Sequence, residues 1–243
     1  MKRYIIAGVL VFLAVLVITF PARIAYQWFA PGEVQLSGIS GSIWNGSASE
    51  GLAAGAYIRD LSWKFKPLSL FAGKLAFETK GSPGLGRMHA DVAVGLDGSL
   101  TLSDLAGNVP LDLVHPTFQQ NGISGDLNLQ FRMLELRNGL PTAATGTVSV
   151  NNLFVPDMSA SQLGDFRADM QTVDDNIVGQ LDDVSGALDV DAASIVVRPD
   201  GSYSLIGNVA AKPGAPPSIE QQLRFLGSPD ERGMRPFRFE GRL

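Results

Sequence analysis

Side chains able to do chemistry are few in this sequence. It has two histidines, His89 and His115, and no cysteine. Neither histidine has a partner at the helical or hairpin spacing of a metal site, and His115 precedes a proline in an expected turn. No GxSxG elbow, Walker loop, GxGxxG after a strand or HExxH motif occurs. We therefore expect a protein that is not an enzyme and uses no cofactor, with both histidines at structural or surface positions.

A group of aspartates is the candidate for a metal site. Calcium is bound by several carboxylate and carbonyl oxygens, and six aspartates occur within residues 174–191. Their spacing fits neither an EF-hand loop nor a glycine-rich calcium repeat, whereas solvated strand faces and turn tips account for it. We expect no metal there. The six residues are Asp174, Asp175, Asp182, Asp183, Asp189 and Asp191.

Aromatic side chains are the remaining candidates for a functional surface. Trp44 lies in the segment GSIWNG, and Trp63 and Phe65 lie at alternate positions of LSWKFKPL. Aromatic residues at such positions could contact a partner or lipid, but alternate aromatics are more often core residues of a sheet. Both interpretations of Trp44, Trp63 and Phe65 remain open at this stage.

The N-terminus predicts a membrane anchor. Residues 4–20 contain no charged side chain, and twelve of these seventeen residues are Ile, Leu, Val or Phe. Their transfer into a bilayer is favourable by about 4 to 7 kcal/mol. Continuation of the helix to Trp28 would complete a span and place Tyr26 and Trp28 in an aromatic belt. A cleaved signal peptide is the main alternative, although no clean pair of small residues follows the apolar run; a core helix of a soluble protein is the other.

Charge sets the expected topology and limits the partners. Lys2 and Arg3 favour a cytoplasmic N-terminus, and Arg23 weakens this bias by one charge. Without Lys2 and Arg3, 17 basic residues remain against 24 acidic ones, so the rest of the chain carries a net charge of −7. Such a domain is a poor candidate for nucleic acid or an anionic lipid surface. We expect a cytoplasmic segment at 1–3, a transmembrane anchor and its interfacial end at 4–28, and a periplasmic β-rich domain at 29–243.

Alternation of apolar and polar residues predicts strands beyond the anchor. The clearest run is 126–132, and similar runs occur at 75–79, 88–94, 147–150, 188–197 and 237–239. A loose unit of glycine followed by two alternate apolar residues recurs, and its glycine is expected to open each strand. Asp97-Gly98 and Asp200-Gly201 are hairpin-turn dipeptides. The six glycines of the unit are Gly73, Gly98, Gly125, Gly146, Gly186 and Gly201.

The predicted fold is all-β, a curved antiparallel meander or partial sandwich, with one N-terminal transmembrane helix and one short C-terminal helix. Residues 218–226 give that second helix, with Ser218 and Gln221 as a capping box and Gly227 as its end. A loop with one helical turn is the alternative there. The apolar face of Leu127, Leu129 and Phe131 is expected to be covered mainly by protein.

Several segments resemble the N component of the bacterial type II secretion system. They are the single N-terminal span, GSIWNG at 41–46, LSW at 61–63 through PL at 67–68, GKL at 73–75, FLGSPD at 225–230 and FRFEG at 237–241. The resemblance implies an accessory inner-membrane component of the apparatus that moves folded proteins out of the periplasm, with other secretion components as partners and no catalytic residues. The architecture also resembles, more loosely, AsmA-like envelope proteins. That likeness implies lipid binding or transfer in an apolar β groove as the alternative function.

Overall fold

The computed structural model describes residues 2–29, 34–53, 56–95, 97–114 and 119–243 of the 243-residue chain. His115 and its expected turn lie outside these residues. Most of the described chain is β-strand, and short helices occur near both termini and in two connections. The helices are α1 (Lys2–Ile18), α2 (Ala22–Phe29), η1 (Pro67–Ala72), η2 (Leu111–Leu113), α4 (Pro217–Leu223) and η3 (Arg224–Leu226).

The strands are short at the N-terminal edge and long in the middle of the sheet. They are β1 (Val34–Ser37), β2 (Ser40–Gly41), β3 (Asn45–Ala53), β4 (Ala56–Phe65), β5 (Leu75–Pro83), β6 (Arg87–Val94), β7 (Leu100–Pro110), β8 (Ser124–Arg137), β9 (Leu140–Phe154), β10 (Gly164–Val173), β11 (Asn176–Gly186), β12 (Leu188–Val197), β13 (Ser202–Ala211) and β14 (Arg235–Arg242).

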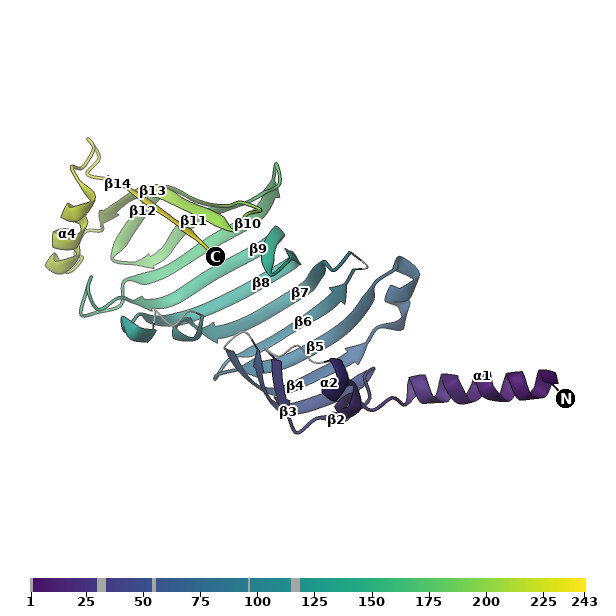
Figure 1. Ribbon diagram of the computed structural model, residues 1–243. Helices are drawn as coiled ribbons and strands as arrows, with labels where there is room; N and C mark the ends of the chain where they lie inside the picture. The colour runs from purple at the N-terminus through teal and green to yellow at the C-terminus, as the bar shows by residue number, and fades with distance from the viewer. Residues whose placement is uncertain (1, 30–33, 54–55, 96, 115–118) are drawn as a thin grey trace.

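The N-terminal segment forms two helices, α1 over the apolar run and α2 beyond Pro21, whereas one continuous helix through Trp28 was expected. Pro21 interrupts the ladder because it has no N–H to donate to the carbonyl of Val17. The backbone at this break pairs with the sheet instead, since the N–H of Ile43 donates to the Phe20 carbonyl at 3.0 Å and Pro21 forms a bridge with Ser42. Helix α1 projects away from the sheet (Figure 1). Among the described residues, no helix is both long and apolar enough to cross a membrane.

The described strands form one open antiparallel sheet of fourteen strands, which confirms the meander expected from the alternation. Each strand from β3 to β13 pairs with the next along the chain, and β1 and β2 both pair with β3. No second sheet packs against it within the described residues, so the partial-sandwich alternative is wrong. The sheet is long and strongly curved (Figure 1). All six runs predicted as strands lie within strands of the structure.

Register keeps the apolar side chains on one face of the sheet. Leu129 on β8 lies opposite Val148 on β9, and Leu127 lies opposite Val150. A bulge between Phe131 and Met133 inserts one residue, so the apolar positions change from odd to even numbers and the same face continues through Leu134 and Leu136. These two residues lie opposite Leu102 and Leu100 on β7. The apolar face of Leu127, Leu129 and Phe131 thus continues across strands β7, β8 and β9.

The main core lies over the middle of this face, centred on Phe131, which is 8% exposed. Gly146 lies opposite Phe131, and a Cβ there would come within 2.5 Å of the Phe131 Cα. Gly146 therefore makes room for the aromatic residue inside β9, and its expected role as a strand-opening glycine is wrong. The other buried members of this core are Ala90, Leu105, Ala144, Ile177 and Val197.

A second core closes the C-terminal end of the sheet. Ile219 and Leu223 of α4 are buried against Leu163, Leu188 and Val209. The predicted short helix is therefore present, but the capping box is wrong. Pro216 is the N-cap residue and no side chain caps the helix, because the chain enters with Pro217 already in the first turn. Gly227, with a positive φ of 107°, ends the following η3 turn as expected.

The two ends of the sheet carry different connections. The end from which α1 projects, termed the α1 end, carries the turn before β3, η1 and the β12–β13 turn, whereas α4 lies at the opposite end (Figure 1). The Asp97-Gly98 and Asp200-Gly201 turns form as predicted, with Gly98 and Gly201 at positive φ. At the α1 end Leu140 lies within 2.9 Å of the Cβ position of Gly201. This contact brings the β8–β9 and β12–β13 turns together and holds the curl of the sheet.

Candidate functional site

The predicted aromatic residues meet where α1 joins the sheet. Phe65 on β4 packs between Trp44 and Phe77 with tilted rings, whose centroids lie 4.8 Å and 5.5 Å from that of Phe65. We term Trp44, Trp63, Phe65 and Phe77 the junction cluster. The structure thus brings together all three aromatic residues singled out in the sequence, each of them half-buried.

Trp44 ties the junction cluster to the end of α1. Its indole Nε1–H donates to the Val17 carbonyl at 2.7 Å. This is the carbonyl that Pro21 leaves without its usual helical partner four residues on. The same carbonyl also accepts the Phe20 N–H, at 3.4 Å. The shorter indole hydrogen bond therefore adds a second donor there and fixes α1 to the turn before β3.

Trp63 completes the junction from the neighbouring strand. Its Nε1–H is shared between the carbonyls of Ser42 and Ile43, at 3.3 Å and 3.2 Å. Its ring occupies the space above Gly46, where a Cβ would lie 2.5 Å from the Trp63 Cζ2. The GSIWNG segment thus supplies an indole, two acceptor carbonyls and a glycine gap, and the cluster joins the end of α1 to the sheet.

The structure separates the residues that suggested metal or acid–base chemistry. His89 is exposed on β6. Asp174 and Asp175 lie at the β10–β11 turn, and the other four aspartates lie along β11 and β12. In the described part of the chain, no group of three or more His, Cys, Asp or Glu side chains is arranged to hold a metal ion.

Asp183 is the most engaged of these carboxylates. Lys212 forms an ion pair with it, and the N–H of Val190 donates to its Oδ1 at 2.9 Å. Burial raises the pKa of the Asp183 carboxyl, but the hydrogen bonds from Lys212 and Val190 outweigh burial, so this pKa lies below its ordinary value. The ion pair links β11 to the chain directly after β13 and so stabilises the C-terminal part of the curved sheet.

Asp183 should make folding sensitive to acid. A carboxyl with a depressed folded pKa stabilises the protein above its unfolded pKa, and this contribution is lost as the pH falls through the folded pKa. The free energy of unfolding, measured with urea in detergent micelles, should therefore fall as the pH drops below about 4, the ordinary pKa of an aspartate. Asp183→Asn should reduce the steepness of that fall, while Asp182→Asn, at an exposed neighbouring position, should leave it unchanged. An equal slope for the parent and Asp183→Asn would contradict this.

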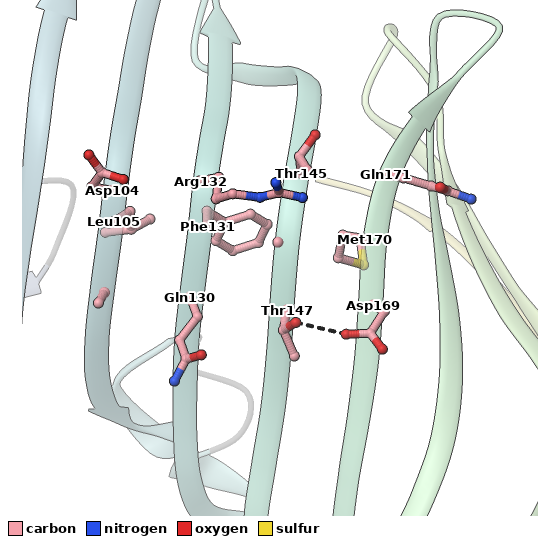
Figure 2. Close-up of a pocket in the computed structure, with 12 residues that line it drawn as sticks. Asp104, Leu105, Gln130, Phe131, Arg132, Thr145, Thr147, Asp169, Met170 and Gln171 are labelled. Atoms are coloured by element: carbon pink, nitrogen blue, oxygen red, sulfur yellow. Dashed lines mark hydrogen bonds between the residues drawn. The ribbon is translucent and has the colours of Figure 1, made fainter.

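A hollow of about 610 Å³ lies across strands β7 to β10. Figure 2 shows the residues that line it, which come from both faces of the sheet because neighbours along a strand alternate. Of these residues, Thr147 donates to Asp169 at 2.7 Å, and Arg167, which does not line the hollow, pairs with the same carboxylate at 2.9 Å. These hydrogen bonds, that of Arg167 foremost, lower the pKa of Asp169. Asp169 is thus held as an ion-paired carboxylate on the sheet surface, an arrangement suited to structure rather than proton transfer.

The connection between β4 and β5 is a feature that the sequence analysis missed. The η1 turn exposes Leu68, Leu70 and Phe71 to solvent, by 78%, 53% and 92%. The sequence PLSLFA carries a signal for it, since Pro67 ends the alternation of β4 and four of the six residues are apolar without period two. The lysines on both sides of this apolar turn were a second signal.

The sheet domain matches a known family. The family model described as "Type II secretion system (T2SS), protein N" matches residues 32–238, most of the 243-residue chain. The chain belongs to this family. The resemblance noted from GSIWNG, FLGSPD and the terminal FRFEG is thereby confirmed.

Two relatives carry the name of the type II secretion protein N family. A "Type II secretion system protein N" of Aeromonas hydrophila is 26% identical over 251 residues, which cover 96% of this chain and 94% of the relative. One of Vibrio cholerae serotype O1 is 27% identical over 258 residues and covers all of both chains. The alignment with the second relative therefore extends over α1 and the junction cluster. No solved structure matches the chain.

Proposed function

We propose that the chain is an accessory component of the type II secretion apparatus, held at the inner membrane by α1 and acting through protein–protein contacts of its periplasmic sheet domain. The observation that carries the proposal is the family match over residues 32–238, which spans the sheet from its first strand into its last. Two relatives named as type II secretion system protein N, aligned over nearly their whole length, support it.

Features of α1 support attachment to the membrane. Its central side chains are exposed on all sides, for example Val11 at 63% and Phe12 at 66%, and it projects away from the sheet (Figure 1). A helix that is apolar all round needs an apolar environment. Its 17 residues rise about 26 Å, and a bilayer adapts to such a short segment by thinning locally. On this proposal residues 1–3 are cytoplasmic, 4–28 form the anchor and its interfacial end, and 29–243 are periplasmic.

An action through binding rather than catalysis fits the described side chains. The perturbed carboxylates, such as Asp97 and Asp200, accept hydrogen bonds from Ser99 and Ser202 in tight turns, which lower their pKa values. These are structural roles at hairpin tips. The partners proposed are other components of the secretion apparatus, on the inner membrane or in the periplasm.

A second candidate function, lipid binding, is favoured by one observation. The apolar face of the sheet is covered by α4 at one end, while Leu102, Leu129 and Leu134 at its middle remain partly exposed. An open curved sheet with such a face resembles the groove of AsmA-like envelope proteins. Phospholipid captured by a photo-crosslinker at position 129, in place of contacts within the chain, would favour this candidate.

Loss of the chain should impair secretion. In the host from which the gene is deleted, a protein normally released by the type II route should accumulate in the periplasm, and the full chain should restore its release. The ratio of medium to periplasmic enzyme activity gives the measurement, and release of a protein that leaves by another route is the control. Unchanged release in the deletion strain would refute the proposal.

A further inference from the structure

The η1 turn is an apolar tip without a protein cover. Phe71 is 92% and Leu68 is 78% exposed, although both belong to a short turn whose backbone is well fixed. Ser69 holds that turn, since its hydroxyl donates to the Lys66 carbonyl at 2.6 Å and accepts the N–H of Ala76 at 3.1 Å. These two hydrogen bonds therefore hold the turn in a conformation that exposes its apolar side chains.

This tip lies at the same end of the sheet as the junction with α1 (Figure 1). Phe65, two residues before η1 begins, packs against Trp44 with ring centroids 4.8 Å apart. Trp44 in turn donates to the Val17 carbonyl in the last turn of α1 at 2.7 Å. Figure 1 shows that the β4–β5 connection lies at the end of the sheet from which α1 projects. One ring contact and one hydrogen bond thus connect the tip to the anchor helix.

The surroundings of the tip are basic in an otherwise acidic protein. The chain carries a net charge of −5, yet residues 64–80 contain four of its lysines and one acidic residue, Glu78. Lys66 is paired with Asp91, and Lys80 with Glu78. Lys64 and Lys74 remain on either side of η1, both exposed. Exposed apolar side chains flanked by lysines are the composition of a segment that binds the interface of an anionic bilayer.

We propose that η1 is a second membrane contact, which inserts Leu68 and Phe71 into the interface of an anionic phospholipid bilayer on the side where α1 emerges. The proposal rests on the attachment by α1 proposed above and deepens it. One helix alone leaves a domain free to tilt and rotate, whereas two contacts fix the orientation of the sheet relative to the membrane. The lysines account for a preference for anionic headgroups, and the fixed backbone of η1 lowers the entropy lost on insertion.

The absence of cysteine allows depth to be measured one position at a time. The full chain is reconstituted in vesicles of phosphatidylethanolamine and phosphatidylglycerol with an environment-sensitive fluorophore on Leu68→Cys, Leu85→Cys or Leu10→Cys, and quenching by brominated lipid is recorded. Leu85 is the matched control, because it is 90% exposed in the connection at the opposite end of β5. Leu10 reports on α1 itself.

We expect quenching at positions 68 and 10 to exceed that at 85 several-fold. Adding Phe71→Ser to Leu68→Cys, or replacing phosphatidylglycerol by phosphatidylcholine, should reduce quenching at 68 and leave position 10 unchanged. Quenching at 10 but not at 68 would overturn this inference and leave the anchor intact. No quenching at 10 would overturn the anchor and this inference with it, and equal quenching at 68 and 85 would mean unspecific adsorption and also overturn it.

Discussion

Phe131→Asp should lower the free energy of unfolding by about 4 kcal/mol or more. Phe131 is 8% exposed at the centre of the main core, and its ring occupies the space that Gly146 leaves open on β9. Loss of a buried phenylalanine costs about 3 to 5 kcal/mol, and a carboxylate without a partner in the same place adds to that cost. Urea unfolding followed by tryptophan fluorescence, in detergent micelles, measures the change.

Gln130→Asp is the control for this substitution. Gln130 is the exposed neighbour of Phe131 on the opposite face of β8, so the same new charge there should change stability by no more than about 0.5 kcal/mol. Equal stability of the two variants would contradict a face covered by protein. Phe131→Asp can also be combined with the photo-crosslinker at position 129. If that variant stayed folded but no longer captured phospholipid at 129, the lipid-binding candidate would replace the secretion scaffold.

Trp63→Ala should lower the free energy of unfolding by about 3 kcal/mol. The half-buried ring fills the space over Gly46, and its N–H is the donor shared by the carbonyls of Ser42 and Ile43. Removal leaves both a cavity and two weakened acceptors in the turn that holds α1. Because the ring is not fully buried, the expected cost lies at the lower end of the range for aromatic truncation.

Trp63→Phe separates packing from hydrogen bonding. It keeps an aromatic ring but removes the donor, so we expect a loss of about 1 kcal/mol. Limited proteolysis between α1 and β3 should become faster in Trp63→Ala and remain slow in Trp63→Phe. A Trp63→Ala variant as stable as its parent would show that the junction cluster is a surface for a partner rather than part of the fold.

The strands of this fold were predictable because burial of one sheet face imposes a strict period of two. Runs such as 126–132 carry that period without interruption, and their order along the chain becomes their order in the sheet. The bulge after Phe131 was not predictable, since the extra residue leaves no mark in composition and only the neighbouring strands fix its position. The same holds for the bulges near Asp60 and Ala192, where non-glycine residues adopt positive φ.

The break at the end of α1 was predictable from the sequence, but one continuous helix was expected instead. Pro21 inside an apolar run predicts a break in the helical ladder, whereas the hydrophobicity of the run favoured one long helix. Local rules also failed at α4, where a capping box was expected from Ser218 and Gln221. There the entry is set by Pro216 and Pro217, and the helix is held by burial of Ile219 rather than by a cap.

The candidate site was predicted in part. Trp44, Trp63 and Phe65 were singled out for their spacing, but their meeting with Val17 depends on contacts between residues far apart in the chain. No periodicity encodes such contacts. The exposed tip at Leu68 and Phe71 was missed because it lies outside every regular pattern, although its flanking lysines distinguish it from an ordinary loop.

The central claim, a secretion component that works from the membrane, is tested most directly by comparing a tethered and a released form in the deletion strain. In the released form a cleavable signal peptide replaces residues 1–20, so the sheet domain reaches the periplasm without α1. Equal amounts of both forms are confirmed by immunoblot, and the fraction of a type II substrate found in the medium is measured. The account predicts release with the full chain and accumulation in the periplasm with the released domain. Equal release of the substrate with the tethered and the released forms would contradict it, and so would full release in the strain that lacks both.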